Sequence, residues 1–172
     1  MDENKDIACP GCGLVATPFE GSVHLYMTSS PHCWNLYGQI LAREYQDSAY
    51  MAHHRLTVDA YALQHPGSEN PQATQSVNIH LLALHLIFSK NMPISDVLKF
   101  MQSFSAKHKG QKILKWLAPP DMKGLITVED VLKAESAEAH GLKVREWAES
   151  VYHRWNTHHK VAERNFYEMV GG

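Results

Sequence analysis

The chain has 172 residues and an apolar content of 44%, which fits one domain, residues 1–172, with a substantial core. Its net charge of −2, with neutral histidines and with lysines and arginines scattered along the chain, argues against binding to nucleic acid or to a membrane surface. An odd count of three cysteines, no signal peptide and no apolar stretch long enough to cross a bilayer predict a cytoplasmic protein.

The first 30 residues predict an irregular segment ahead of the helices, which we call the lead. Cys9–Gly13 reads Cys-Pro-Gly-Cys-Gly, a tight turn. Residues 15–23 carry threonine, proline and glycine without a clear period. This composition is typical of an irregular segment or a short hairpin.

Residues 31–172 predict a bundle, because apolar and aromatic residues recur there at helical spacing. Ser30 and Asn70 each precede a proline, the usual order at the start of a helix. The predicted helices begin at Pro31, at Asp47 or Ser48 (ending near Gln64), at Pro71, at the cap Ser95, at Thr127 (ending near Ala134) and at Ala137 (ending near Met169).

Two of these helices should fill the core. Residues 79–88 are apolar nearly all round, which places the helix from Pro71 at the centre of the bundle. The last helix should bury a stripe made of Val144, Trp147, Val151, Trp155 and Ala162. Since only Leu125–Val128 gives a weak strand signal, the predicted fold is all-α, a helical bundle of five to six helices with a short irregular N-terminal zinc-knuckle segment.

The cysteines predict a metal site in the lead. Cys9 and Cys12 have the spacing and the intervening proline and glycine of a metal knuckle, and Cys33 is the only other thiol. Zinc takes four ligands in a tetrahedron, so one ligand remains to be found. His24 is the first choice because it lies between the two cysteine groups, and His32 and His54 are the alternatives.

Two other interpretations of the thiols stay open. Cys9 and Cys12 could be a surface or redox pair, with Cys33 packed as a small hydrophobe. A site with three cysteines and one histidine would be closed, hence structural, and would fasten the lead to the bundle.

Twelve histidines are the outlier of the composition, and some predict a second site. His54, Tyr61 and His65 fall almost in line on one helix, and His80 lies on the next. Helices packed antiparallel could bring His54, His65 and His80, with His158 from the last helix, toward one interior space. Asp59 is the nearby carboxylate, although its position on the helix suits an ion pair with Arg55.

These residues support two functional hypotheses. In the first, the protein is a small metal-dependent enzyme with a small-molecule substrate; a second metal in the bundle activates water, and His54, Asp59, His65 and His80 are catalytic. In the second, it is a non-catalytic zinc-stabilised domain that binds a protein partner or a second copy of itself, and its histidines bond to neighbours such as Gln75, Ser76 and Tyr61.

Four segments resemble an uncharacterised bacterial family, domain of unknown function 5946. They read CPGCG from Cys9, HLYMTSSPHCW from His24, LTVDAYALQHPG from Leu56 and QSVNIHLLALHL from Gln75. The resemblance implies that the cysteine and histidine groups are parts of one design, and it implies no activity. The positions that it includes are Cys9, Cys12, His24, Cys33, His54, Asp59, His65, Gln75 and His80.

Overall fold

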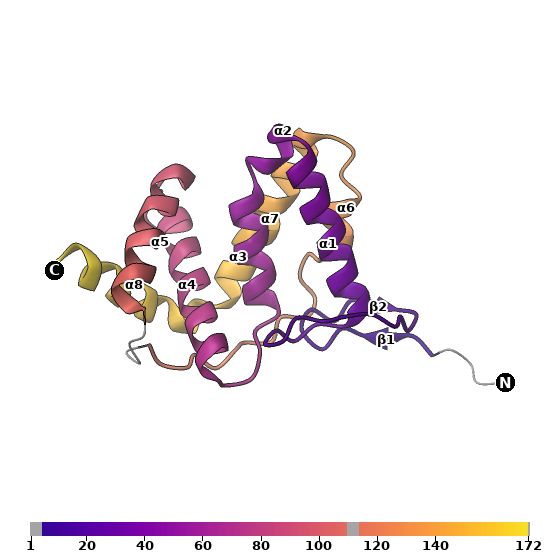
Figure 1. Ribbon diagram of the computed structural model, residues 1–172, viewed down its shortest axis with the longest axis horizontal. Helices are drawn as coiled ribbons and strands as arrows, with labels where there is room; N and C mark the ends of the chain where they lie inside the picture. The colour runs from indigo at the N-terminus through magenta and orange to yellow at the C-terminus, as the bar shows by residue number, and fades with distance from the viewer. Residues whose placement is uncertain (1–4, 110–113, 172) are drawn as a thin grey trace.

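The computed structural model describes residues 5–109 and 114–171, most of which are helical. Two short strands, β1 (Ile7–Ala8) and β2 (Val15–Ala16), pair antiparallel in the lead. The helices are α1 (Pro31–Gln46), α2 (Ser48–Met51), α3 (His54–Gln64), α4 (Pro71–Phe88), α5 (Ile94–His108), α6 (Val128–Leu132), α7 (Ala137–Arg154), the 3-10 helix η1 (Asn156–His158) and α8 (His159–Val170) (Figure 1). The predicted all-α class with an irregular, cysteine-bearing lead is confirmed.

Side-chain caps fix three of the predicted helix starts. The Ser30 side chain accepts a hydrogen bond from the Cys33 N–H, and the Asn70 side chain accepts one from Ala73. Each cap satisfies an N–H that the first turn leaves without a partner. Ser136 caps α7 in the same way.

Two predicted helices are broken in the structure. The described residues therefore contain eight α-helices, where five or six were expected. The helix expected from residue 48 to 64 divides at Ala52 and His53 into α2 and α3. The last helix stops at Trp155, whose indole N–H donates to the Leu63 carbonyl at 3.1 Å. This anchor turns the chain, so that α7 packs on α3 and α8 on α4 (Figure 1).

The starts of two further helices lie within one residue of those predicted. Helix α5 begins at Ile94, one residue before the expected cap Ser95, because the Pro93 carbonyl accepts from the N–H groups of Asp96 and Val97. The weak strand at residues 125–128 does not form, and Val128 instead opens α6.

The core follows the predicted pattern. Helix α4 packs against α3, α5, α7 and α8, and the leucines of its middle are fully buried. The stripe on the last two helices is at most 2% exposed; it comprises Val144, Trp147, Val151, Trp155 and Ala162. Within the described residues, no helix is both long and apolar enough to cross a membrane.

Candidate metal centre

The hairpin of the lead presents two buried thiols. Between β1 and β2, the Cys9 N–H donates to the Leu14 carbonyl at 2.8 Å, and the Gly13 N–H donates back to the Cys9 carbonyl at 2.9 Å. Gly13 has φ +80°, a conformation that glycine adopts without strain. The resulting turn directs Cys9 and Cys12 to the same side, where both are almost fully buried.

The first turn of α1 adds the third thiol. Cys33 is fully buried, and its position is fixed by the Ser30 cap. The Ser30 N–H also donates to the Cys9 sulfur at 3.3 Å. The same residue therefore starts the helix and ties it to the knuckle.

The end of α3 supplies a histidine rather than another turn of helix. His65 is the C-terminal cap of α3, with φ −124° and ψ 49°, so its backbone leaves the helix. Its carbonyl accepts a hydrogen bond from the Thr28 N–H at 3.1 Å, and the next residue, Pro66, forms an antiparallel β-bridge with Met27. This backbone pairing holds the lead against the end of α3.

The His65 ring is oriented by a hydrogen bond on one nitrogen only. Its Nδ1 lies 2.9 Å from the Tyr61 carbonyl oxygen, which can only accept, so Nδ1 carries the proton. The lone pair of Nε2 therefore faces Cys33, whose sulfur is 3.3 Å away. A metal-binding histidine is usually held in this way, with its other nitrogen donating to a carbonyl or a carboxylate.

The four donor atoms have the spacing of a tetrahedral site. The sulfurs of Cys9, Cys12 and Cys33 and one ring nitrogen of His65 all lie within 4.8 Å of one another. The Cys12 and Cys33 sulfurs are 3.8 Å apart, and the three cysteines are free thiols. Ligands about 2.3 Å from a central zinc ion would be separated by roughly 3.8 Å along the edge of a tetrahedron.

Aromatic rings close the site on one side. Tyr61 stacks on His65 with ring centres 4.0 Å apart and on Tyr37 at 3.8 Å. The Tyr61 hydroxyl donates to the Cys33 sulfur at 3.6 Å. Burial, and then the charge of Cys33, raise the pKa of Tyr61, so its hydroxyl stays a neutral donor.

Hydrogen bonding and burial shift the pKa values of the three thiols in different directions. Hydrogen bonds from Cys12 and Cys33 hold the pKa of Cys9 well below its ordinary value. The pKa of Cys33 is raised far above its ordinary value by Cys12, by Cys9 and by burial. These directions favour a thiolate on Cys9 and thiols on Cys12 and Cys33, and a bound cation would favour ionisation of the other two sulfurs as well.

Gly11 allows the knuckle to approach α3 closely. A Cβ at this position would lie 2.5 Å from Cδ2 of His65 and 3.1 Å from the Gln64 carbonyl oxygen, and closer still to the Thr28 carbonyl oxygen. No side chain fits there without moving backbone.

His65, not His24, lies with the three cysteines. The His24 ring instead packs edge-on against Tyr26 and Trp34, and its Nδ1 accepts from the Tyr26 N–H at 3.4 Å. A helical wheel predicts that His65 belongs to the histidine group, because it falls in line with His54. The Pro66-Gly67 pair is the signal that could have corrected this assignment. A residue just before such a helix stop no longer follows helical geometry, so a helical wheel does not give its direction.

The residues expected to form the histidine site lie in four different places. His158 bonds to the Ala118 carbonyl at 2.8 Å, away from the other three histidines. His65 belongs to the cysteine cluster, whereas Asp59 pairs with Arg55 and His80 at 2.8 Å and 2.7 Å. His54 pairs with Glu44 at 2.7 Å. Over residues 5–109 and 114–171, the cysteine cluster is the only group of three or more His, Cys, Asp or Glu side chains with metal-ligand spacing.

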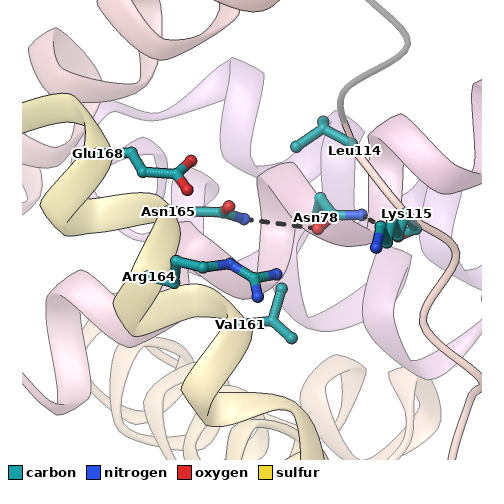
Figure 2. A pocket seen from close by; sticks show the side chains of 7 residues that line it. All are labelled: Asn78, Leu114, Lys115, Val161, Arg164, Asn165 and Glu168. Atoms are coloured by element: carbon teal, nitrogen blue, oxygen red, sulfur yellow. Dashed lines mark hydrogen bonds between the residues drawn. The ribbon is translucent and has the colours of Figure 1, made fainter.

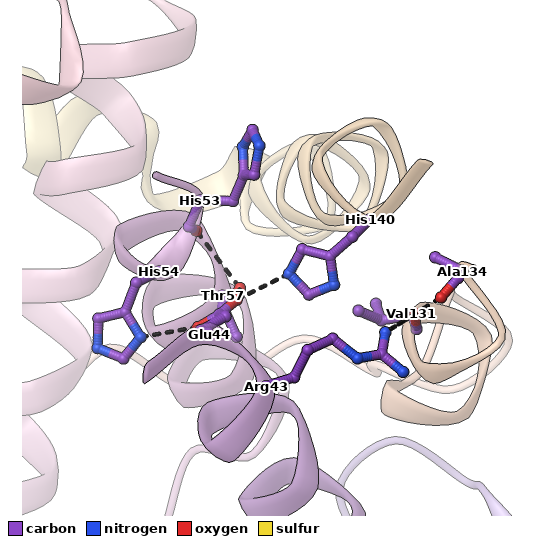
Figure 3. A network of polar contacts seen from close by, with 8 residues as sticks. All are labelled: Arg43, Glu44, His53, His54, Thr57, Val131, Ala134 and His140. Carbon is purple, nitrogen blue, oxygen red and sulfur yellow. Dashed lines mark hydrogen bonds and ion pairs between the residues drawn. The ribbon is translucent and has the colours of Figure 1, made fainter. Parts of the chain in front are cut away.

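Glu44 organises a separate network between α1, α3 and α7 (Figure 3). Its carboxylate is fully buried and lies within hydrogen-bonding distance of His54, Thr57 and His140. These are hydrogen-bond distances between adjacent polar groups, so the network needs no ion at its centre. Beside it, Arg43 donates to the backbone carbonyls that end α6.

A polar cavity of about 270 Å³ lies between α4 and α8 (Figure 2). Asn78 donates to the Lys115 carbonyl at 2.9 Å and accepts from Asn165 at 3.5 Å. The amides therefore mainly satisfy each other and the backbone, and none of the residues predicted to be catalytic lines this cavity.

Comparisons with known proteins identify the family. Neither the curated proteins nor the solved structures contain a match to this chain. The model of a family of unknown function, DUF5946, matches residues 7–156, which include all four residues of the cysteine and histidine cluster. The chain belongs to this family of unknown function.

Proposed function

We propose that Cys9, Cys12, Cys33 and His65 bind one zinc ion and that this ion fastens the lead to the helical bundle. The observation that carries the proposal is the orientation of His65. Its Nδ1 proton is committed to the Tyr61 carbonyl, so the lone pair of Nε2 points at the three sulfurs. As a thiol, Cys33 can donate a hydrogen bond to this lone pair, and when zinc is bound the same lone pair is placed to be its fourth ligand.

Ligand chemistry favours zinc among the divalent metals. Three thiolates and one imidazole form a soft donor set, which suits zinc and disfavours magnesium, calcium and manganese. The Ser30 N–H and the Tyr61 hydroxyl donate to the sulfurs of Cys9 and Cys33. Such donors offset the excess negative charge that three thiolates leave around a divalent ion.

A structural role fits this site better than a catalytic one. Four protein ligands complete the tetrahedron, and a catalytic zinc normally keeps one position for water. All four ligands are buried, with at most 2% of each residue exposed. The ligands come from the hairpin, from α1 and from the end of α3, so one ion would join three segments that lie far apart in the sequence.

Metal analysis of the purified protein tests the proposal. We expect one zinc per chain, with the zinc lost in Cys12→Ser and in His65→Ala. The matched control is His24→Ala, which should keep its zinc because His24 lies outside the cluster. A metal-free native protein, or full zinc content in His65→Ala, would overturn the proposal.

Cobalt substitution gives a readout that does not depend on folded variants. Cobalt(II) bound in place of zinc by the wild-type chain should show the visible bands of a tetrahedral site with thiolate ligands. Bands typical of six-coordinate cobalt would contradict a closed site with three cysteines and one histidine.

A second candidate function, self-association through the lead, is favoured by its exposed apolar side chains. Leu25 is fully exposed and Val15 is 60% exposed, and three further apolar side chains of the lead, Ile7, Phe19 and Val23, are each about half exposed. Apolar groups gathered on one segment are typical of an interface. We expect the wild-type chain to dimerise with rising concentration in analytical ultracentrifugation and the Val15→Ser/Leu25→Ser variant to stay monomeric; a wild-type chain that is monomeric throughout would refute this role.

A further inference from the structure

A cavity of about 460 Å³ lies between the junction of α2 and α3, the start of α5 and the first half of α7. Leu56, Ile94 and Leu142 give it apolar walls, and His53 and Arg145 are among the few polar side chains that line it. Apolar walls with a small number of polar groups are the usual form of a small-molecule site. No residue of the cysteine cluster lines the cavity, so it is separate from the metal centre.

Gly141 shapes this cavity by letting His53 stand against α7. A Cβ at Gly141 would overlap Nε2 and Cε1 of the His53 ring and would lie 2.9 Å from its Cδ2. Glycine inside a helix is less favourable than alanine, so the close approach of the ring explains why glycine stands here. The His53 ring points away from Glu44, whereas His54 and His140 turn toward it (Figure 3). His53 therefore belongs to the cavity and not to the Glu44 network.

The hydrogen-bonding groups of the His53 ring are available to a ligand. Its backbone carbonyl accepts from Thr57, but no hydrogen bond among the described residues uses either ring nitrogen. Burial, and then the nearby His140, lower the pKa of His53, so the ring is neutral near pH 7. A neutral imidazole carries one N–H, which can donate to an acceptor inside the cavity.

Arg145 places a positive charge on the same wall. Its guanidinium lies over the Phe88 ring, 5.2 Å from the ring centre, and such stacking leaves the N–H groups at the edge of the guanidinium available. Glu146 and Glu149 of the same helix pair with other cations. Glu138, which also lines the cavity, is two helical turns away, about 10 Å along the axis. No ion pair among the described residues uses the charge of Arg145, which is thus available to an anion.

We propose that this cavity binds a small carboxylic acid with an apolar body. Arg145 follows Gly141 by four positions, so it lies one turn from the point where His53 meets α7, on the same face of the helix. The carboxylate accepts hydrogen bonds from the Arg145 guanidinium and from the His53 N–H, and the body of the ligand packs on the apolar walls. Complementary charge selects the acid group, and the buried apolar area selects the body.

Side-chain NMR of His53 and Arg145 in the purified protein tests the proposal, with hexanoate, acetate and 1-hexanol as probes. We expect hexanoate to shift both sets of signals saturably in the millimolar range. Acetate lacks the apolar body and 1-hexanol lacks the charge, so each should bind about tenfold more weakly or less. Acetate binding as well as hexanoate would indicate an adventitious anion, and equal binding of 1-hexanol would indicate an apolar groove alone. Either result, or no saturation by hexanoate, would overturn the proposal.

Two substitutions on α7 separate the guanidinium from the general charge of the helix. Arg145→Met keeps an unbranched apolar stem and should weaken hexanoate binding by about tenfold or more. The matched control Lys143→Met removes a positive charge two positions away, outside the cavity, and should leave the affinity unchanged. Equal affinity in Arg145→Met and wild type, or an equal loss in both variants, would show that the guanidinium does not hold the ligand.

His53→Phe tests the second hydrogen bond. Phenylalanine keeps the ring that fills the space beside Gly141 but has no N–H to donate. We expect hexanoate to bind severalfold more weakly to this variant, while 1-hexanol binds no more weakly than it does to wild type. An unchanged affinity for hexanoate would refute the role of His53.

Discussion

Replacing Gly11 with alanine would put a methyl group where the knuckle meets the end of α3. The new Cβ would lie 2.5 Å from the His65 ring and 3.1 Å from a backbone carbonyl of Gln64, well inside van der Waals contact. Overpacking of this kind typically costs about 1–3 kcal/mol. Because the methyl group contacts His65 directly, the loss should come with weaker metal binding, although every ligand is still present.

The matched control for this variant is Gly38→Ala on α1. A Cβ there meets no atom within 4 Å, and alanine in a helix is more favourable than glycine by roughly 0.5–1 kcal/mol. For a chain of this size, about 1 kcal/mol corresponds to roughly 2–4 °C in Tm. We therefore expect Gly11→Ala to melt several degrees lower than wild type and Gly38→Ala to melt slightly higher.

Thermal unfolding followed by circular dichroism, with zinc release followed by a chromogenic chelator, measures both effects. Gly11→Ala should release zinc faster than wild type, and Gly38→Ala at the same rate. If Gly11→Ala melts and releases zinc as the wild type does, the close contact between the knuckle and His65 is not a feature of the folded protein, and the proposed site loses its geometry.

Three further predictions concern other parts of the chain. Removal of zinc by a chelator should let a protease cut within residues 5–30 before it cuts the bundle; early cleavage in the helices would show that the ion does not hold the lead. Glu44→Gln should lower the free energy of unfolding in urea by about 1–3 kcal/mol, because His54 and the buried His140 lose their carboxylate acceptor, and an unchanged urea midpoint would contradict this. Lys90 and then His85 hold the pKa of Glu163 below its ordinary value of 4.5, so the ionised carboxylate stabilises the fold above that pH. Wild type should accordingly be more stable than Glu163→Gln near neutral pH, and the difference should disappear as the pH falls through the lowered pKa; a difference that persists in acid would refute the ion pair.

The cysteine part of the centre was predictable because its geometry is local. A Pro-Gly pair between Cys9 and Cys12 makes a turn whatever the rest of the chain does. Cys33 is predicted as the third ligand because the chain has no other cysteine. The start of α1 was also predictable, since Ser30 and Pro31 are a cap and a first helical residue in sequence as in structure.

The fourth residue was not predictable from spacing in the sequence. His65 is 32 positions from Cys33, and its approach depends on how α3 packs and where it ends. A helical wheel assumes that the helix continues, and it therefore grouped His65 with His54. The pairing of Thr28 with the His65 carbonyl is a tertiary contact that no local rule supplies.

The break after α7 had a similar cause. Trp155 belongs to the predicted buried stripe, and the apolar spacing of the stripe continues past Trp155 to Ala162. What ends α7 is the hydrogen bond from the buried indole to the Leu63 carbonyl on another helix. Periodicity shows which face is buried, and it carries no information about a polar group that must find a partner across the core.

The number of histidines was a poor guide to the position of a site, because an imidazole serves well as an internal hydrogen-bond partner. His108 bonds to the carbonyl of Phe104, His159 to that of Tyr152, and His85 lies between the Tyr152 hydroxyl and Glu163. For such residues the bonds within the fold account for the ring. His65 differs because one of its nitrogens is fixed by the fold while the other faces the thiols of the cysteine cluster. What the second nitrogen of His65 faces, rather than the count of rings, is therefore the observation that separates this candidate ligand from the structural histidines of the bundle.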